Sequence, residues 1–454
     1  MEFLNRLFKL KEHNTSVRVE VIAGITTFMA MAYILAVNPS ILSVTGMDRN
    51  ALFVSTAVAS AIGCLCMAFS NLPFGLAPGM GLNAYFAYTV CIGMNCSWQF
   101  ALTAVFVEGV IFLLLSALDI REAIFNSIPR NLKLGISSGI GLFIAFIGLL
   151  NSKLVVMDAS TAVTRFSFRS SSFESVGITV VLTVIGIILT AVLLIRKVKG
   201  AILIGILATW GLGMLCEKCG WYVPNAELGM YSLLPDFSSG LAVPSIKPIF
   251  FKFDLRGVIN NLGNFFIIML TFLFGDCFDT LGTLMGVATK SNMLDKDGKL
   301  PGIKKALIAD AIATSAGAVL GVSTTTTYVE SSAGTAEGGR TGLTAIVIGL
   351  LFLLSIFISP VFLAIPSFAT APALIIVGFM MVTAFLDIDR DDLSEAIPAF
   401  IAMVAMPFMY SIAEGISIGI ISYVLINVFT GKAKKVHPIM YVLAVLFILR
   451  YAFL

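Results

Sequence analysis

Two short polar stretches interrupt an otherwise apolar sequence, and both carry carboxylates. In the first, Asp276, Asp279 and Thr283 are spaced three and four residues apart, which places them on one face of a helix. The second, 323–334, is rich in Ser, Thr and Gly and contains Glu330. A charged side chain at bilayer depth is expensive and is expected to face a cavity, an ion path or a partner. We predict that these carboxylates meet at one site halfway across a membrane.

The other ionisable residues inside the predicted apolar segments are also acidic, namely Glu108, Asp310, Glu337 and Glu414. No Lys or Arg is available at that depth to pair with them. A carboxyl group in a low-dielectric environment takes up a proton readily, so the pattern favours proton coupling, with Na⁺ as the second option. The same pattern argues against an anionic substrate.

A planar, neutral ligand with N–H donors along one edge would suit such carboxylates, because paired charge-assisted hydrogen bonds are strong and directional. A purine has that edge. Asn83 could read a ring nitrogen or carbonyl, since an amide both donates and accepts. Tyr33 and the Thr26–Thr27 pair could line the same cavity.

Structural roles compete with these interpretations. Glu108 and Asp310 are expected to form hydrogen bonds between helices. Glu337 precedes Gly-Gly-Arg340, so a local pair with Arg340 is favoured over substrate contact. Asp276 and Asp279 could also serve only to pair with neighbouring spans.

The composition is that of a polytopic membrane protein. The chain has 454 residues, of which 58% are hydrophobic and 12% charged, and its mean hydropathy is +0.99. Soluble domains are about 25% charged. The charged first 20 residues lack a signal-peptide pattern, so we expect the first apolar stretch to be an uncleaved span. Cys216 and Cys219 form a C-x-x-C without a second pair at zinc-type spacing, and no metal site is predicted.

Apolar segments near the length that a bilayer requires, about 20 residues, divide the chain into seven spans and seven spans. The predicted spans are 21–40, 51–71, 74–91, 98–118, 131–151, 174–195 and 200–216, then 257–286, 303–321, 323–338, 342–363, 368–386, 395–410 and 412–430. A last apolar stretch, 439–454, either spans the membrane or lies at its interface. With the N-terminus in the cytoplasm, 20 of the 29 Lys and Arg residues lie inside and 8 outside, as the positive-inside rule expects.

Halves of seven spans must have opposite orientations, which is the inverted-repeat arrangement of secondary transporters. The third span is interrupted by Pro78, Gly79 and Gly81, and its counterpart, the tenth, contains the Thr run 324–327 and Glu330. Interrupted segments at corresponding positions of the two halves indicate a midplane binding site. We predict that both begin with a short extended piece that leads into a half-helix.

Five ordered motifs resemble the AzgA-like branch of the nucleobase:cation symporter-2 family, whose members are permeases for hypoxanthine, guanine and adenine. The resemblance runs from Phe8 to Leu454. The motifs are Gly24-Ile-Thr-Thr-Phe-Met-Ala-Met-Ala-Tyr33 with Asn38-Pro39, Gly79-Met-Gly-Leu-Asn-Ala-Tyr85, Phe278-Asp-Thr-Leu-Gly-Thr283, Thr327-Tyr-Val-Glu-Ser-Ser-Ala-Gly334 and Glu337-Gly-Gly-Arg-Thr-Gly342.

The resemblance implies an all-α membrane protein with core and gate domains, substrate bound between them, proton symport and a homodimer. Its domain layout is a cytoplasmic N-terminus (1–20), core segments 21–118 and 257–363, gate segments 119–216 and 364–430, an extracytoplasmic loop (217–256), and a basic linker with a C-terminal apolar segment (431–454).

Residue by residue, the resemblance matches Asp279 to the family's span-eight acid, Glu330 to its span-ten acid and Asn83 to the span-three amide of the purine branch. Asp276 matches an acid of this branch, and Thr283 stands where some relatives carry His or Asp. The predicted substrate-binding set is Asp279, Glu330, Asn83, Asp276, Thr283, Gly81, Val329 and Ser331, with Asp279, Glu330 and Asp276 as the groups for proton coupling.

The function predicted from these observations is proton-coupled uptake of purine nucleobases across the cell membrane by alternating access, without an enzymatic reaction, a cofactor or a nucleic-acid partner. A permease of the same fold for uracil, xanthine or an inorganic anion is the alternative. An intramembrane aspartyl hydrolase is a third hypothesis, but Gly275-Asp276 lacks the Gly-x-Gly-Asp pattern associated with such enzymes.

Overall fold

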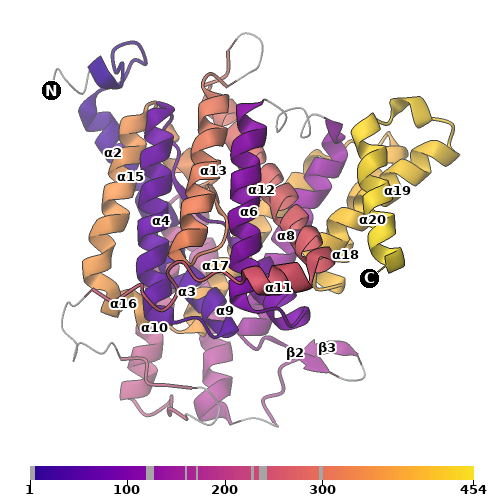
Figure 1. The fold of residues 1–454 in the computed structure, drawn as a ribbon. Helices are drawn as coiled ribbons and strands as arrows, with labels where there is room; N and C mark the ends of the chain where they lie inside the picture. Colours follow the sequence, from indigo (N-terminus) through magenta and orange to yellow (C-terminus); the bar gives the residue numbers. More distant parts are fainter. Residues whose placement is uncertain are drawn as a thin grey trace.

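Long apolar helices dominate the computed structural model (Figure 1), which describes residues 6–118, 127–158, 161–169, 172–225, 230–234, 243–295 and 300–453. The elements of the first half are α2 (Val17–Met31), α3 (Ile34–Leu42), η1 (Ser43–Thr45), α4 (Arg49–Phe69), β1 (Leu76–Pro78), α5 (Met80–Ala84), η2 (Tyr85–Gly93), α6 (Trp98–Ala117), α8 (Arg130–Asn151), β2 (Val155–Asp158), β3 (Ala162–Arg165), η3 (Phe173–Gly177), α9 (Ile178–Ile195) and α10 (Ala201–Lys218).

The second half repeats this pattern of long helices around a short strand. Its elements are α11 (Leu255–Asn260), α12 (Leu262–Lys290), α13 (Ile303–Leu320), β4 (Thr325–Thr327), α14 (Ser331–Ala336), α15 (Gly342–Ser355), η5 (Ile356–Ile358), α16 (Ser359–Leu363), α17 (Ser367–Val382), η6 (Thr383–Asp387), α18 (Leu393–Phe408), α19 (Ile412–Phe429), η7 (Ala433–Lys435) and α20 (Pro438–Phe453).

Ten segments of the described chain are long and apolar enough to cross a membrane. The other four predicted spans do not meet this criterion of length and composition, each for a reason that the structure shows. The third and tenth are divided between a strand and a half-helix. The ninth, α13, carries Lys304, Lys305 and Asp310, and the thirteenth, α18, has 16 residues. Fourteen segments in two halves of seven therefore account for the helices up to α19.

Some predicted boundaries differ from the structure. The eighth span was expected from residue 257, but α11 is a separate short helix and α12 begins at Leu262, after a non-helical Asn261. The first span is interrupted between α2 and α3. The C-terminal apolar stretch forms α20, which packs on α19 and places Phe447 6.5 Å from Phe274 of α12, centroid to centroid. The predicted boundary between residues 118 and 119 adjoins 119–126, which lie outside the described residues.

The helices pack as two groups. The first helix group comprises α2–α6 and α12–α15, and Figure 1 shows α2, α15, α4, α13 and α6 side by side within it. The second helix group comprises α8–α10 and α17–α19. Glycines permit the closest approaches inside each group: a Cβ on Gly109 would lie 2.9 Å from the backbone nitrogen of Ser315, and one on Gly378 would lie 2.8 Å from that of Ala145. Such backbone proximity is how membrane helices associate without a hydrophobic driving force between them.

The two ends of the bundle carry different structures. The N-terminal face contains the start of α2 and the turn before α15, where the Glu20 carboxylate accepts hydrogen bonds from the Arg340, Thr341 and Thr344 amides and from the Thr344 hydroxyl. The opposite, hairpin face carries the antiparallel β2–β3 pair (Figure 1). Glu20 is fully buried, so it fixes the first span to the eleventh.

The strands β1 and β4 meet inside the first helix group and pair antiparallel, with Leu76 opposite Thr327 and Pro78 opposite Thr325. Both strands are buried. The prediction that the third and tenth spans begin with extended pieces is therefore confirmed. Irregular backbone at this depth is tolerated because each strand supplies hydrogen-bond partners for the other.

Candidate functional site

The crossing of β1 and β4 brings the two interrupted spans together. The Gly79 amide donates to the Thr324 carbonyl at 2.9 Å, and the Tyr328 amide donates to the Gly75 carbonyl at 2.9 Å. These bonds extend the pairing on either side of the strands. The half-helices α5 and α14 start directly beyond it, so residues at their first turns converge on one region.

Asp279 faces this crossing from α12. Its Oδ2 accepts a hydrogen bond from the Thr326 hydroxyl of β4 at 3.2 Å, and a Cβ on Gly79 would lie 3.4 Å from the same oxygen. Asp279 is partly exposed, whereas Asp276, one turn earlier, is fully buried. The structure thus places Asp279 beside both interrupted spans, as predicted.

Glu330 lies where β4 leads into α14. The Tyr33 hydroxyl, from the break between α2 and α3, donates to Glu330 Oε1 at 2.6 Å. Glu330 is 7% exposed and Tyr33 1% exposed. Asp279 of α12 bonds to Thr326 of β4, and Glu330 follows the end of β4 by three residues, so both carboxylates lie beside the same strand of the second half. Val329 is 37% exposed, which shows that this turn borders space not filled by protein.

Asn83 occupies a different position from the two carboxylates. It is fully buried, its Oδ1 accepts a hydrogen bond from Ser323, and its Nδ2 lies 3.5 Å from the Pro78 carbonyl. The Tyr328 hydroxyl donates to that same carbonyl at 2.6 Å. The Asn83 side chain therefore links α5 to Ser323, in the segment that precedes β4.

Of three other predicted site residues, Gly81 and Ser331 have packing or hydrogen-bonding roles. Gly81 faces α8, and a Cβ there would lie 3.7 Å from Ile144 Cδ1 and closer still to Ile140. The Ser331 hydroxyl accepts a hydrogen bond from the Gly75 amide at 3.0 Å. Thr283 is partly buried on α12, one turn beyond Asp279.

Asp276 and Asp310 form a second polar cluster between α12 and α13. The Thr280 hydroxyl lies 3.0 Å from Asp276 Oδ1 and 2.8 Å from Asp310 Oδ1. All three residues are fully buried. The interhelical role expected for Asp310 is confirmed, and Asp276 faces this cluster, not the strand crossing.

One side of α12 borders open space. A Cβ added at Gly282 or at Gly286 would meet no heavy atom within 4 Å, and both glycines are exposed. They follow Asp279 at spacings of three and seven, which places them on the same helix face. The face of α12 that follows Asp279 is therefore not covered by other parts of the protein at these two glycines.

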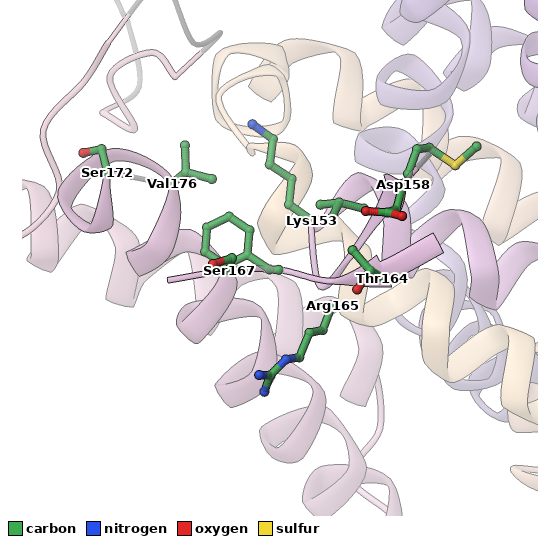
Figure 2. Close-up of a pocket in the computed structure, with 10 residues that line it drawn as sticks. Lys153, Asp158, Thr164, Arg165, Ser167, Ser172 and Val176 are labelled. Atoms are coloured by element: carbon green, nitrogen blue, oxygen red, sulfur yellow. The ribbon is translucent and has the colours of Figure 1, made fainter. Parts of the chain in front are cut away.

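The largest cavity that we describe lies away from these carboxylates. It has a volume of about 590 Å³ and is lined by residues of the β2–β3 pair and its neighbours. Figure 2 shows Lys153, Asp158, Thr164 and Arg165 around it, with the Arg165 side chain directed away from the others. A groove of about 190 Å³ lies between α12 and α20. Neither cavity is lined by Asp279 or Glu330.

Polar contacts join the two helix groups at both faces. At the N-terminal face, Lys199 Nζ lies 2.7 Å from Glu337 Oε1. The predicted local pair of Glu337 with Arg340 is wrong, because the Arg340 guanidinium instead donates to the Thr335 and Gly339 carbonyls. This placement frees Glu337 to reach the turn between α9 and α10.

At the hairpin face, the Asn151 amide donates to the Tyr88 hydroxyl at 2.9 Å, and the Thr89 hydroxyl donates to the Tyr410 carbonyl at 3.1 Å. The Tyr88 and Tyr410 rings also meet edge to face, 6.2 Å apart. Buried aromatic and hydrogen-bonded contacts thus close this face.

Several functional contacts were not foreseen from the sequence. The partners of the two carboxylates, Thr326 and Tyr33, come from segments distant in sequence, and Tyr33 was expected only to line the cavity. Glu20 was assigned to the N-terminal flank and not recognised as a buried carboxylate. Its position four residues after Ser16, at the start of the first span, was the available signal.

Within the described part of the chain, no group of three or more His, Cys, Asp or Glu residues could hold a metal ion. Cys216 and Cys219 are free thiols. The acids near the strand crossing accept hydrogen bonds from the hydroxyl groups of Thr326 and Tyr33.

Comparisons with known proteins agree with this architecture. A model described as "Permease family" matches residues 18–418. The chain is 42% identical over 453 residues to adenine permease AdeP of Escherichia coli (99% of this chain, 96% of the relative) and 44% identical over 461 residues to guanine/hypoxanthine permease PbuG of Bacillus subtilis (99% and 100%). It is also 49% identical over 455 residues to putative permease MJ0326 of Methanocaldococcus jannaschii (100% and 99%).

Solved structures show the same fold at low sequence identity. The transmembrane domain of the cyanobacterial bicarbonate transporter BicA matches with a TM-score of 0.62 and 13% identity, over 87% of this chain and 97% of that one. Murine Slc26a9 in its inward-facing state matches with a TM-score of 0.62 and 10% identity, over 91% of this chain and 68% of that one.

The strand crossing, the seven-plus-seven helices and the family match identify a multi-pass membrane protein of the inverted-repeat transporter fold. The aspartyl hydrolase hypothesis is wrong, because this is a family of permeases and not of enzymes. The chain belongs to the permease family, and its predicted membership of the nucleobase:cation symporter-2 group is confirmed.

Proposed function

We propose that this protein takes up purine nucleobases across the cell membrane by proton symport. The observation that carries the proposal is that two carboxylates flank β4 at the β1–β4 crossing: Asp279 accepts a hydrogen bond from Thr326, and Glu330 follows the strand after an exposed Val329. Relatives named as adenine and as guanine/hypoxanthine permeases, 40–44% identical to this chain, support the substrate class.

Two carboxylates suit a neutral purine because each can accept charge-assisted hydrogen bonds from ring or exocyclic N–H groups. Thr326 and Tyr33 each donate to one carboxylate oxygen, which leaves acceptor capacity for a ligand, since an ionised carboxylate offers about four lone-pair sites. Charged groups within a bundle commonly form proton relays. Asp279 and Glu330 are therefore the proposed substrate and proton groups.

For transport, the first helix group would act as the core domain and the second as the gate domain. The contacts at the hairpin face are extensive, whereas at the N-terminal face an exposed ion pair joins the groups and α12 borders open space. With the N-terminus in the cytoplasm, as the charge distribution favours, this arrangement corresponds to an inward-facing state. A homodimer completes the proposal.

The test is uptake of labelled hypoxanthine, guanine and adenine in a host without purine permeases. We expect saturable uptake of at least one purine that collapses on addition of a protonophore. Uptake that persists unchanged with the protonophore would remove proton coupling, and failure with all three purines would remove the substrate class.

A pyrimidine or oxidised purine is the second candidate. It is favoured by a relative named putative xanthine/uracil permease C887.17 of Schizosaccharomyces pombe, which is 36% identical over 463 residues. Competition of labelled purine uptake by unlabelled uracil and xanthine separates the two, because a true substrate competes at concentrations near its own KM.

A further inference from the structure

We infer that Tyr33 is the positioning residue for Glu330, and that the break in the first span exists to place its hydroxyl there. This inference rests on the proposed function and adds to it a residue that controls substrate affinity. The phenol oxygen lies 2.6 Å from Glu330 Oε1, although the two residues are 297 positions apart in sequence.

The local backbone explains how Tyr33 reaches the carboxylate. A continuous helix from α2 into α3 would place the side chain at residue 33 in register with those at 29 and 37. Instead the Leu35 amide bonds to the Ala32 carbonyl, three residues back, and Tyr33 lies in the turn between the two helices. The tighter turn redirects the phenol toward the β4–α14 junction.

Packing on both sides holds the pair in place. Gly334, one turn into α14, approaches α2 so closely that an added Cβ would lie 2.6 Å from the Ala23 carbonyl oxygen and closer still to the Thr27 hydroxyl. This contact fixes the axis of α14 relative to α2. Tyr33 and Glu330 are both buried, so packing restricts the rotamers of both side chains.

In the contact between Tyr33 and Glu330, the phenol is the donor and the carboxylate is the acceptor. A phenol carries one proton, and it donates that proton to Oε1. Oε2 and the remaining lone pair of Oε1 stay available to a ligand. Asp279 of α12, which bonds to Thr326 of β4, is the second acid beside this strand and has the same charge as Glu330. Tyr33 is therefore the donor that orients the Glu330 carboxylate.

A preoriented carboxylate lowers the ordering cost of binding. Without the phenol hydroxyl, Glu330 would have to be oriented by the substrate itself. Because a hydrogen bond to a charged group contributes more than a neutral one, Tyr33→Phe is expected to raise KM for the transported purine about tenfold. The maximal rate is expected to stay within about twofold, since the same carboxylate remains at the site.

The experiment measures KM and maximal rate for whichever of labelled hypoxanthine and adenine the wild-type chain takes up, in Tyr33→Phe and in the matched control Tyr222→Phe. Tyr222 is also a buried tyrosine, 2% exposed, and its hydroxyl donates to the Tyr231 carbonyl at 2.7 Å, far along the chain from the carboxylates. We expect the KM change in Tyr33→Phe only, with equal thermal stability of the two purified variants.

A double-mutant cycle with Glu330→Asp tests the mechanism. The shorter side chain withdraws the carboxylate from the phenol, so adding Tyr33→Phe to Glu330→Asp should change hypoxanthine or adenine binding to the purified protein by less than twofold. An undiminished tenfold effect in that background, or an unchanged KM in Tyr33→Phe alone, would overturn the inference. If the wild type takes up neither purine, the proposed function fails instead.

Discussion

Lys199, in the turn between α9 and α10, forms a 2.7 Å ion pair with Glu337, at the end of α14, and so joins the two helix groups at the N-terminal face. The Lys199 side chain is 53% exposed and that of Glu337 31% exposed. Exposed ion pairs contribute only about 0–1 kcal/mol, so this contact can open and reform during transport without a large barrier.

The ion pair predicts a charge-reversal result. Lys199→Glu should lower the uptake rate severalfold, because two carboxylates then face each other across the boundary between the groups. The exchange Lys199→Glu with Glu337→Lys should restore most of the rate. Initial rates in matched vesicles test this, and a double variant no better than the single one would show that the pair has no part in transport.

Loss of either carboxylate at the strand crossing should abolish uptake. Asp279→Asn and Glu330→Gln keep the side-chain shape but remove the charge that accepts hydrogen bonds from Thr326 and Tyr33. We expect at least a hundredfold loss in kcat/KM, corresponding to about 2.7 kcal/mol or more. Immunodetection of membrane-inserted protein provides the control, and near-normal uptake by either variant would remove that acid from the site.

The open space beside α12 predicts a steric block. Gly282→Leu and Gly286→Phe would each place a side chain where no heavy atom lies within 4 Å, so folding should be preserved while the path from Asp279 is narrowed. Uptake should fall at least tenfold. Gly211→Leu is the matched control, because Gly211 on α10 also borders open space. Equal uptake in all three variants would mean that this face of α12 lies off the route.

Close packing in the second helix group predicts a stability effect. Gly378→Val would force a side chain toward the backbone of α8, where even a Cβ would lie 2.7 Å from Ala145 Cβ. Overpacking of this kind costs about 1–3 kcal/mol. We expect a lower midpoint of thermal unfolding in detergent, measured by loss of monodisperse protein, whereas Gly431→Asn at an exposed turn should leave it unchanged.

The loop before α18 predicts a dependence on pH. Asp392 accepts hydrogen bonds from Lys435 at 2.6 Å and from Lys432 at 3.3 Å, and the contact with Lys435 holds the pKa of the Asp392 carboxyl below its ordinary range. A carboxyl whose folded-state pKa is depressed contributes stability above its unfolded value of about 3.9 and loses it as pH falls.

The hydrogen-exchange protection factors of the α18 N-terminus and of the 432–435 segment, which are corrected for the intrinsic pH dependence of amide exchange, should therefore be unchanged from pH 8 to pH 5 and should fall below about pH 4. Asp392→Asn should remove this acid-dependent step. Because the group is partly solvated, the effect is expected to be local, and a transition in the variant at the same pH would assign it to another carboxyl.

The sequence was informative where physical signals are local. Apolar length and basic flanks located the spans, and Pro78, Gly79 and the Thr run located the extended pieces, because such residues disfavour a continuous helix. The free-energy cost of a charge in lipid indicated that Asp279 and Glu330 face other parts of the protein and not the hydrocarbon. In these cases one residue type has one strongly preferred environment.

Side-chain pairs between segments that are distant in sequence could not be predicted from such local signals. Glu337 has both Arg340 and Lys199 within reach of a flexible side chain, and only the packing of the α9–α10 turn decides between them. Asn83 has several possible partners, and Ser323 is selected by the register of the crossing strands. Glu20 lies in a charged segment and becomes buried only because the turn before α15 folds over it.

The antiparallel pairing of β1 with β4 determines which parts of the protein can travel together. Each three-residue strand satisfies the polar backbone of a strand from the other repeat, so separating them inside the membrane would leave bare amides and carbonyls in hydrocarbon, at several kcal/mol per group. The paired ends of the two interrupted spans are therefore expected to move as one rigid unit. We therefore expect conformational change during transport to occur at the boundary between the two helix groups and to leave the β1–β4 pair intact.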